Sequence, residues 1–455
     1  MSQRPSNKVT THQSYLRKNL ALAWPLAVNV LLVQSMLMID ILLVAPLGEV
    51  PVAAMGIATA IVAFALGVEL AAGNGIQLLI GRAYGSKKQA DLAVTYWIGL
   101  FINSAIALVF FLVLVFFDTK IVATLSDDVL IQKQVLVYLA ITKYIILFTA
   151  FTQVCTAFYN GCGNTKIPLK GFLIEVPANA ILSYFLIYGV GDLNGLGLQG
   201  AAWGSLAAVL LRCMYFHIVL KIDNSVNLSY PKERPFLKEM RPQFAEIFPI
   251  AANFFVLFIG ASVYQLMYAQ LELSSFVAIT LIFPWIRIGT QFVSAWSNAS
   301  AINISQAIGD NETQHLRLFV SACTRATIAL SVTVAVLFFL LSQFIHIIYP
   351  NVEATTYAAL AVIAPWYILL PIIRGYNSLA GNVLRALGES NRVLKLHFVT
   401  QWMIALPVCA LLIFYFDVSV FWAFAMIPIE ELLKTFHFYR WTQSKLSVTV
   451  NAVHF

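Results

Sequence analysis

Charged side chains are scarce in this 455-residue sequence, and that scarcity excludes most classes of soluble protein. Asp, Glu, Lys and Arg make up 11% of the residues, whereas hydrophobic residues make up 60%. An ordinary globular chain holds about 25% charged residues. Apolar runs of about 18 residues or more recur along the sequence, and each is long enough to cross a hydrocarbon core of about 30 Å. The composition therefore predicts a helical membrane protein with many spans.

Catalytic and metal-binding motifs are also missing. The sequence contains no His-Glu-x-x-His, no Gly-x-Ser-x-Gly, no paired Asp motif and no cluster among its 7 His residues. The 5 cysteines stand at spacings that no metal site uses, so we interpret them as packing residues. We therefore expect neither an enzyme nor a bound metal or other cofactor. No segment resembles the filter loop of a channel.

The apolar runs predict an all-α polytopic membrane protein with twelve transmembrane helices in two pseudo-symmetric six-helix bundles. A polar linker, 221–245, separates an N-lobe at 20–220 from a C-lobe at 246–441, between a segment at 1–19 and a tail at 442–455. The predicted spans are 20–46, 53–84, 96–117, 129–159, 168–190, 199–220, 246–268, 276–308, 316–345, 355–386, 393–416 and 418–441.

The positive charge follows the topology of the predicted spans. The net charge is +7, yet nearly all Lys and Arg lie at the termini and in alternate loops, and the opposite loops hold only Lys120 and Lys133. This is the distribution that the positive-inside rule describes, and it predicts that both termini are cytoplasmic. We therefore expect a lipid bilayer, and no nucleic acid, as the partner of the charged segments.

The two halves resemble each other in sequence. At a shift of 224 residues, 24–29 aligns with 248–253 and Asn74 with Asn298, and near 225, 163–165 aligns with 388–390. Six spans separate the repeats, so both halves insert in the same direction, as in transporters that rock two bundles about a central site. A duplicated membrane scaffold without transport is the alternative.

Asp40 is the ionisable residue of the first span. A charge at that depth costs several kcal/mol unless it is paired, hydrated or neutralised. It is either a structural group bonded to a neighbouring helix or a site that binds H⁺ or Na⁺. Pro25 lies in the same span, and we expect the helix to bend there when Asp40 is protonated. Polar, uncharged residues predicted to surround Asp40 are Tyr138, Thr156, Asn179 and Ser183.

The remaining intramembrane charges predict structural ion pairs. Counting residues from the cytoplasmic ends places Glu69 level with Lys143, and Glu175 level with Arg212. In the second half, Glu430 and Lys434 are four residues apart on one helix face. Arg374 is expected to pair with Glu430 or Glu431.

Several motifs resemble those of multidrug and toxic compound extrusion (MATE) transporters, and the resemblance covers essentially the whole chain. Each motif is short, but their order and spacing are specific. They are Trp24-Pro25, Ala83-Tyr84-Gly85, Gly161-x-Gly163-x-Thr165-Lys166 and Asn179…Tyr184-x-x-Ile187-Tyr188-Gly189.

The resemblance implies efflux of lipophilic, often cationic compounds by alternating access, driven by cation antiport. Asp40 then matches the family's coupling aspartate, and the polar residues named above match the network around it. Ser183 departs from members that carry a second aspartate there. Leu257 and Arg374 stand where Na⁺-linked members carry acidic residues, and Tyr264 is the counterpart of Asp40. H⁺ is therefore favoured over Na⁺.

A flippase for lipid-linked oligosaccharide or a related lipid is the alternative, because it can share this two-lobe architecture. Such a protein is expected to have a strongly basic cavity for pyrophosphate, whereas cations such as Arg287 and Arg374 are few here. We further expect a monomer in a bacterial inner membrane, and the resemblance implies small-molecule drugs as its substrates.

Overall fold

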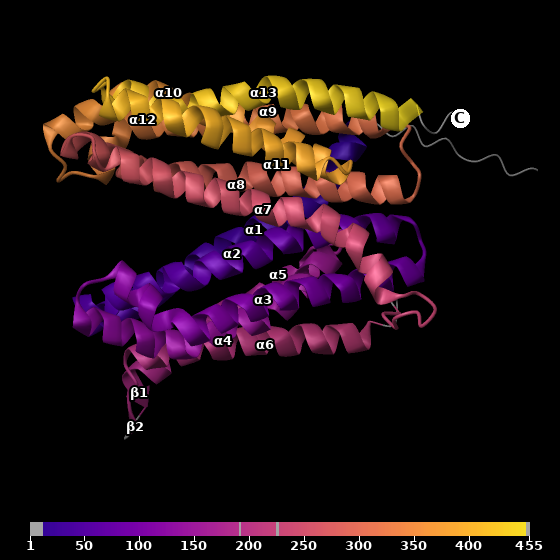
Figure 1. The fold of residues 1–455 in the computed structure, drawn as a ribbon, viewed down its shortest axis with the longest axis horizontal. Helices are drawn as coiled ribbons and strands as arrows, with labels where there is room; N and C mark the ends of the chain where they lie inside the picture. Colours follow the sequence, from indigo (N-terminus) through magenta and orange to yellow (C-terminus); the bar gives the residue numbers. More distant parts are fainter. Residues whose placement is uncertain (1–11, 191–192, 224–226, 452–455) are drawn as a thin grey trace, which may run out of the picture. The chain divides into compact units, whose positions relative to one another are not determined.

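Long α-helices make up almost all of the computed structural model, which describes residues 12–190, 193–223 and 227–451 (Figure 1). Eleven helices in these ranges are long and apolar enough to cross a membrane. A twelfth long helix, α13 (Val420–Asn451), carries Glu430, Glu431 and Lys434 in its middle. The predicted all-α, twelve-helix fold class is confirmed for the described residues.

The chain divides into two compact units. We call Val28–Phe254 the first bundle, and Met1–Ala27 with Phe255–Phe455 the second bundle. These divisions lie inside α1 and α7 rather than in the predicted linker at 221–245. Several helices also extend past the predicted spans, since α1 begins at His12 and α7 at Phe236. Polar helix ends extend beyond the apolar stretch on which span prediction depends.

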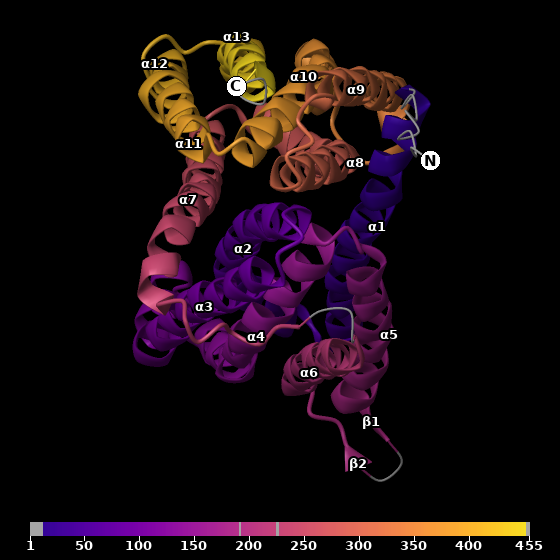
Figure 2. The ribbon, with the colours of Figure 1, turned by 90° about the vertical axis from the view of Figure 1, so that its right-hand side faces the viewer.

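The first bundle is built around α4 (Val129–Gly161), which packs against α2, α3 and α6. The antiparallel strands β1 and β2 project from the ends of α5 and α6 in both views (Figures 1 and 2). Its other elements are α1 (His12–Val44, from Val28), η1 (Ala45–Leu47), α2 (Glu49–Gly85), α3 (Gln89–Leu125), α5 (Lys166–Tyr188), β1 (Gly189–Val190), β2 (Leu193–Asn194), α6 (Leu198–Ile222) and the first half of α7 (Phe236–Tyr268).

The second bundle is built around α10 (Ala354–Ala386), which packs against α8, α9 and α13 (Figure 2). One of its spans changes helix type midway, because a π-helical segment, η2, joins α11 to α12. This segment packs the Gln401 side chain against Gly260 of α7. The remaining elements are α8 (Leu273–Gly309), α9 (Leu316–Ile348), α11 (Ser390–Phe398), η2 (Val399–Ala405) and α12 (Leu406–Phe414).

The helix bounds follow the sequence repeat. Glu49–Gly85 of α2 and Leu273–Gly309 of α8 have 37 residues each and are displaced by 224 at both ends. Helices α1 and α7 have 33 residues each and the same displacement. Helices α4 and α10 also have 33 residues each, displaced by 225. The predicted duplication is therefore confirmed in the fold.

Both α1 and α7 contribute residues to the two bundles. In the second bundle, the buried Asn19 of α1 donates to the Trp296 carbonyl (3.2 Å) and accepts from the Asn303 amide (3.1 Å). In the first bundle, Glu246 of α7 accepts from Arg82 of α2 at 3.0 Å. Helix α1 continues through Pro25, shortly before the division after Ala27. Bending at Pro25 remains a prediction.

Helices α5 and α6 approach closely because α6 has no side chain at two positions. Gly200 and Gly204 are four residues apart, the small-xxx-small spacing that lets transmembrane helices pack backbone against backbone. A Cβ at 200 would collide with the Leu186 carbonyl, and a Cβ at 204 would collide with Ser183. The glycines therefore position α5, which carries Asn179 and Ser183.

We expect Gly204→Ala to lower the stability of the purified protein by about 1–3 kcal/mol, because the added methyl overpacks the contact with Ser183. Thermal unfolding in detergent measures this change. Gly56→Ala is the matched control, since a Cβ at that helical position meets no atom within 4 Å. Equal melting temperatures for the two variants would contradict this account of α5–α6 packing.

Candidate functional site

Asp40 is buried between α1 and α5 of the first bundle. It is 8% exposed, and its carboxyl faces the side-chain amide of Asn179. That amide donates a 3.0 Å hydrogen bond to the Ser205 hydroxyl of α6. The Oδ1 atoms of Asp40 and Asn179 both lack a hydrogen-bond partner among the described residues. The site therefore offers buried oxygens that have no donor.

Tyr138 of α4 completes this cluster. Its ring is 4% exposed, and its hydroxyl interacts with Ser205 of α6 and Thr59 of α2, close enough to Asp40 for their charges to interact. Sequence reasoning missed Ser205 and Thr59. Ser205 directly follows Gly204, whose close packing brings α6 onto α5, and this spacing was a signal that could have identified it.

Two other predicted members lie differently. Thr156 is 18 residues from Tyr138 on the same helix, about 27 Å at 1.5 Å per residue, so the structure does not bring it to Asp40. Its hydroxyl donates to the Thr152 carbonyl at 2.7 Å. Ser183 is fully buried under Gly204, one helical turn after Asn179, and its hydroxyl has no partner in the described part of the chain.

The predicted ion pair between Glu69 and Lys143 is absent from the described residues. The register of α2 against α4 explains its absence. Thr59 of α2 lies by Tyr138 of α4, and a Cβ at Gly73 of α2 would meet Gln153 of α4. Each residue of α2 is therefore level with the residue of α4 whose number is about 80 higher. Glu69 is therefore level with Thr149, about 9 Å from Lys143 along the helix. The depth estimate failed because the two helices end at different levels.

Glu175 of α5 and Arg212 of α6 form a buried ion pair, as their predicted depths suggested. The distance from Arg212 Nη1 to Glu175 Oε2 is 2.7 Å. Arg212 also donates to the Thr152 hydroxyl at 2.8 Å and lies over the Phe172 ring. The pair joins α4, α5 and α6. Because each charge compensates the other, we interpret the pair as structural.

The second bundle neutralises its charges where the first bundle has Asp40. Tyr264, the repeat counterpart of Asp40, donates to Glu430 at 3.0 Å. Glu430 pairs with Lys434 at 2.5 Å, and Glu431 with Lys434 at 3.5 Å. Arg374 pairs with Glu431 at 3.4 Å rather than with Glu430. Both carboxylates at this place in the second bundle are therefore paired with cations, and they do not form a site like that of Asp40.

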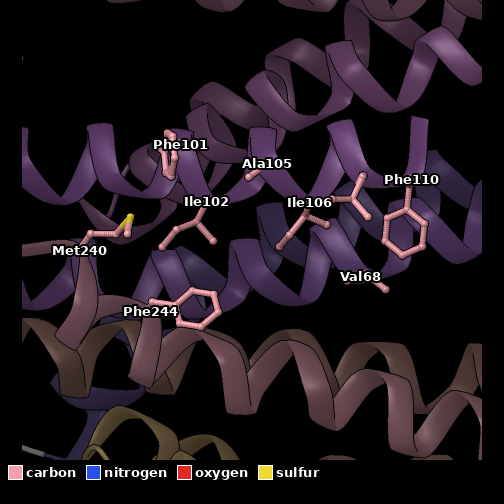
Figure 3. A pocket seen from close by; sticks show the side chains of 9 residues that line it. Val68, Phe101, Ile102, Ala105, Ile106, Phe110, Met240 and Phe244 are labelled. Atoms are coloured by element: carbon pink, nitrogen blue, oxygen red, sulfur yellow. The ribbon is translucent and has the colours of Figure 1, made fainter. Parts of the chain in front are cut away.

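An apolar cavity of about 450 Å³ lies in the first bundle between α2, α3 and α7. Figure 3 shows Phe101 and Ile106 of α3, and Met240 and Phe244 of α7, turned toward it beside Val68 of α2. Its volume is within the range of ligand pockets, about 300–1,000 Å³. Its lining offers apolar contact and no charge.

Part of the chain is similar to a known family. Residues 25–185 match the family model described as MatE. The chain is also 20% identical over 410 residues to the probable multidrug resistance protein YoeA of Bacillus subtilis (strain 168). This similarity covers 86% of this chain and 84% of that protein.

Solved structures share the whole architecture. The Vibrio cholerae MATE transporter VcmN in the bent form is 18% identical, with a TM-score of 0.85 over 98% of this chain and 99% of that one. A MOP superfamily transporter from Pyrococcus furiosus, described as having a binding pocket of reverse polarity, is 14% identical. Its TM-score is 0.84, over 98% of this chain and 99% of that one. At these identities the likeness shows the fold.

We expect Arg212→Met to lower the stability by about 3–5 kcal/mol, because it leaves the Glu175 carboxylate buried without its partner. Adding Glu175→Gln should restore most of the loss, and thermal unfolding of the purified variants measures both effects. Arg234→Met is the matched control, since its pair with Asp91 is partly exposed and worth about 0–1 kcal/mol. A double variant as unstable as Arg212→Met would contradict the pairing argument.

Proposed function

We propose that the chain is a member of the MATE family and acts as a secondary active multidrug exporter in which Asp40 couples efflux to proton entry. Alternating access moves the compound outward while protons flow inward. Members of this family are transporters rather than enzymes. The proposal depends on one observation, the buried and uncompensated carboxyl of Asp40 among neutral polar groups.

The polar groups around Asp40 suit a proton that is bound and released. The charged carboxylate lacks a cation among the described residues of the first bundle, so burial favours its neutral form. A protonated Asp40 becomes a donor, which the orphaned Asn179 Oδ1 needs. Tyr138 and Ser205 can re-orient their hydroxyls as the charge changes. The same group of side chains can therefore accommodate both states.

The coupling ion is the proton rather than Na⁺ in this proposal. In the second bundle, Leu257 and Arg374 stand where the resemblance leads us to expect the acids of Na⁺-linked members. Tyr264 replaces the carboxylate at the counterpart of Asp40. Ser183 likewise offers the first bundle a hydroxyl rather than a second carboxylate. A single carboxyl suits one proton better than a cation that needs several oxygen ligands.

The substrates proposed are lipophilic, often cationic drugs. The apolar cavity between α2, α3 and α7 supports the lipophilic part of this description. The location proposed is a bacterial inner membrane, with both termini in the cytoplasm as the positive-inside pattern predicts, and the protein acts as a monomer.

We expect Asp40→Asn to abolish dye uptake driven by a pH gradient, because asparagine cannot exchange a proton. The assay uses Na⁺-free proteoliposomes, a preset pH gradient and a fluorescent cationic dye. Asp127→Asn makes the same chemical change at an exposed carboxylate and should leave uptake unchanged. Dye uptake by Asp40→Asn should equal that of empty liposomes.

A second arm replaces the pH gradient with a Na⁺ gradient at equal pH. Uptake in the parent protein under these conditions would show that Na⁺ is the coupling ion. Full pH-driven uptake by Asp40→Asn would remove Asp40 from the coupling mechanism. Absence of dye transport in every arm, with folded protein, would argue for another substrate class such as a lipid.

A further inference from the structure

Glu69, in the middle of α2, is a buried carboxylate that the cluster around Asp40 does not use. Its side chain has no exposed surface, and neither carboxylate oxygen has a hydrogen-bond partner in the described part of the chain. An ionised carboxylate in such a place costs several kcal/mol unless a cation compensates it. Whether Glu69 is ionised or protonated therefore depends on whether the neighbouring helices place a cation beside it.

The neighbouring charges on α4 and α6 are not available to Glu69. Lys143 lies about six residues away in register, or about 9 Å along α4. Arg212 of α6 is paired with Glu175, and it donates to Thr152 rather than toward α2. No ion pair within the described residues includes Glu69.

The side of α3 and α7 presents apolar groups. Val68, the residue before Glu69, faces the apolar cavity that α3 and the first half of α7 line (Figure 3). Glu246 of α7 pairs with Arg82, which lies 13 residues beyond Glu69 on α2, about 20 Å away. Tyr96 of α3 interacts with Cys155 of α4.

The cations of these helices lie far from Glu69 along the helix axes. Lys120 of α3 is 15 residues beyond Ala105, which lines the cavity with Val68. Arg241 of α7 is 13 residues before Phe254, which meets Gly67. At 1.5 Å per residue, both are about 20 Å from the level of Glu69.

A polar face of α4 runs past Glu69 to the end of the helix. At 100° per residue, six polar residues of α4 lie within about 60° of one another. Two contacts along this face turn it toward α2, since Tyr138 meets Thr59 and a Cβ at Gly73 would meet Gln153. The six residues are Tyr138, Thr142, Thr149, Gln153, Thr156 and Asn160.

We propose that Glu69 binds a proton, at a second site of the first bundle that is separate from Asp40. Glu69 lies level with Thr149, 11 residues or about 16 Å along α4 from Tyr138 and nearer to Gly161. The positive-inside pattern assigns that end of α4 to the cytoplasm. The proton exchanges along the polar face through Gln153, Thr156 and Asn160, so Thr156 serves this site rather than Asp40.

The role of this proton in transport rests on the proposed function, whereas its binding can be measured without transport. Infrared spectra of the purified protein in liposomes resolve the carbonyl band of a protonated carboxylic acid. We expect the Asp40→Asn protein to retain such a band at neutral pH and to lose it at alkaline pH. Adding Glu69→Gln should remove the band. Glu49→Gln, at the exposed start of the same helix, is the matched control and should leave it unchanged.

Several outcomes would overturn the proposal. One is a neutral-pH spectrum of Asp40→Asn without the band, and another is a band that persists after Glu69→Gln. Because glutamine is nearly isosteric with protonated glutamate, the proposal also requires Glu69→Gln to fold and melt like the parent. A misfolded variant would indicate a charged Glu69 with a cation partner. None of these results bears on dye transport by Asp40, so the two proposals fail separately.

Discussion

The cost of removing a carboxylate from water governs the interior of both bundles. The first bundle buries Asp40, Glu69 and Glu175, and the one buried cation among its described residues is Arg212. That cation is used by Glu175, so two carboxylates lack compensation by a neighbouring charge. In the second bundle, Lys434 bridges Glu430 and Glu431, and Arg374 adds a second contact. A duplicated scaffold thus carries two different solutions to one electrostatic constraint.

This difference depends on helix packing that the two halves share. Helices α4 and α10 have equal lengths and lie at the centres of their bundles, so substitutions on equivalent neighbours change the chemistry without changing the frame. Asp40 and Tyr264 show the result. Asp40 faces an amide, whereas Tyr264 donates to a carboxylate already paired with lysine. The helix arrangement is therefore repeated in the two bundles, whereas the side chains at these equivalent positions differ in their chemistry.

Much of the fold was accessible from the sequence, because apolar length and repeat spacing are properties of single segments. The site was less accessible, because it depends on how helices are displaced along one another. Counting from helix ends brought Glu175 to Arg212 but placed Lys143 beside Glu69, although α2 and α4 end at different levels. Thr156 was assigned to Asp40 for its chemistry, although it lies five turns from Tyr138. Ser205 and Thr59 were missed because hydroxyls are common in spans and are informative only once register is known.

The start of α1 belongs to the second bundle, and this constrains the order in which parts of the chain can fold during synthesis. Asn19 emerges from the ribosome with the first span, yet its partners Trp296 and Asn303 are 277 and 284 residues later. At about 5–20 residues per second, this interval is roughly 15–55 s. During it, Val28–Phe254 can assemble as a unit while the preceding segment lacks its binding surface. Residues 12–27 of α1 are therefore among the last parts of the described chain to reach their final place.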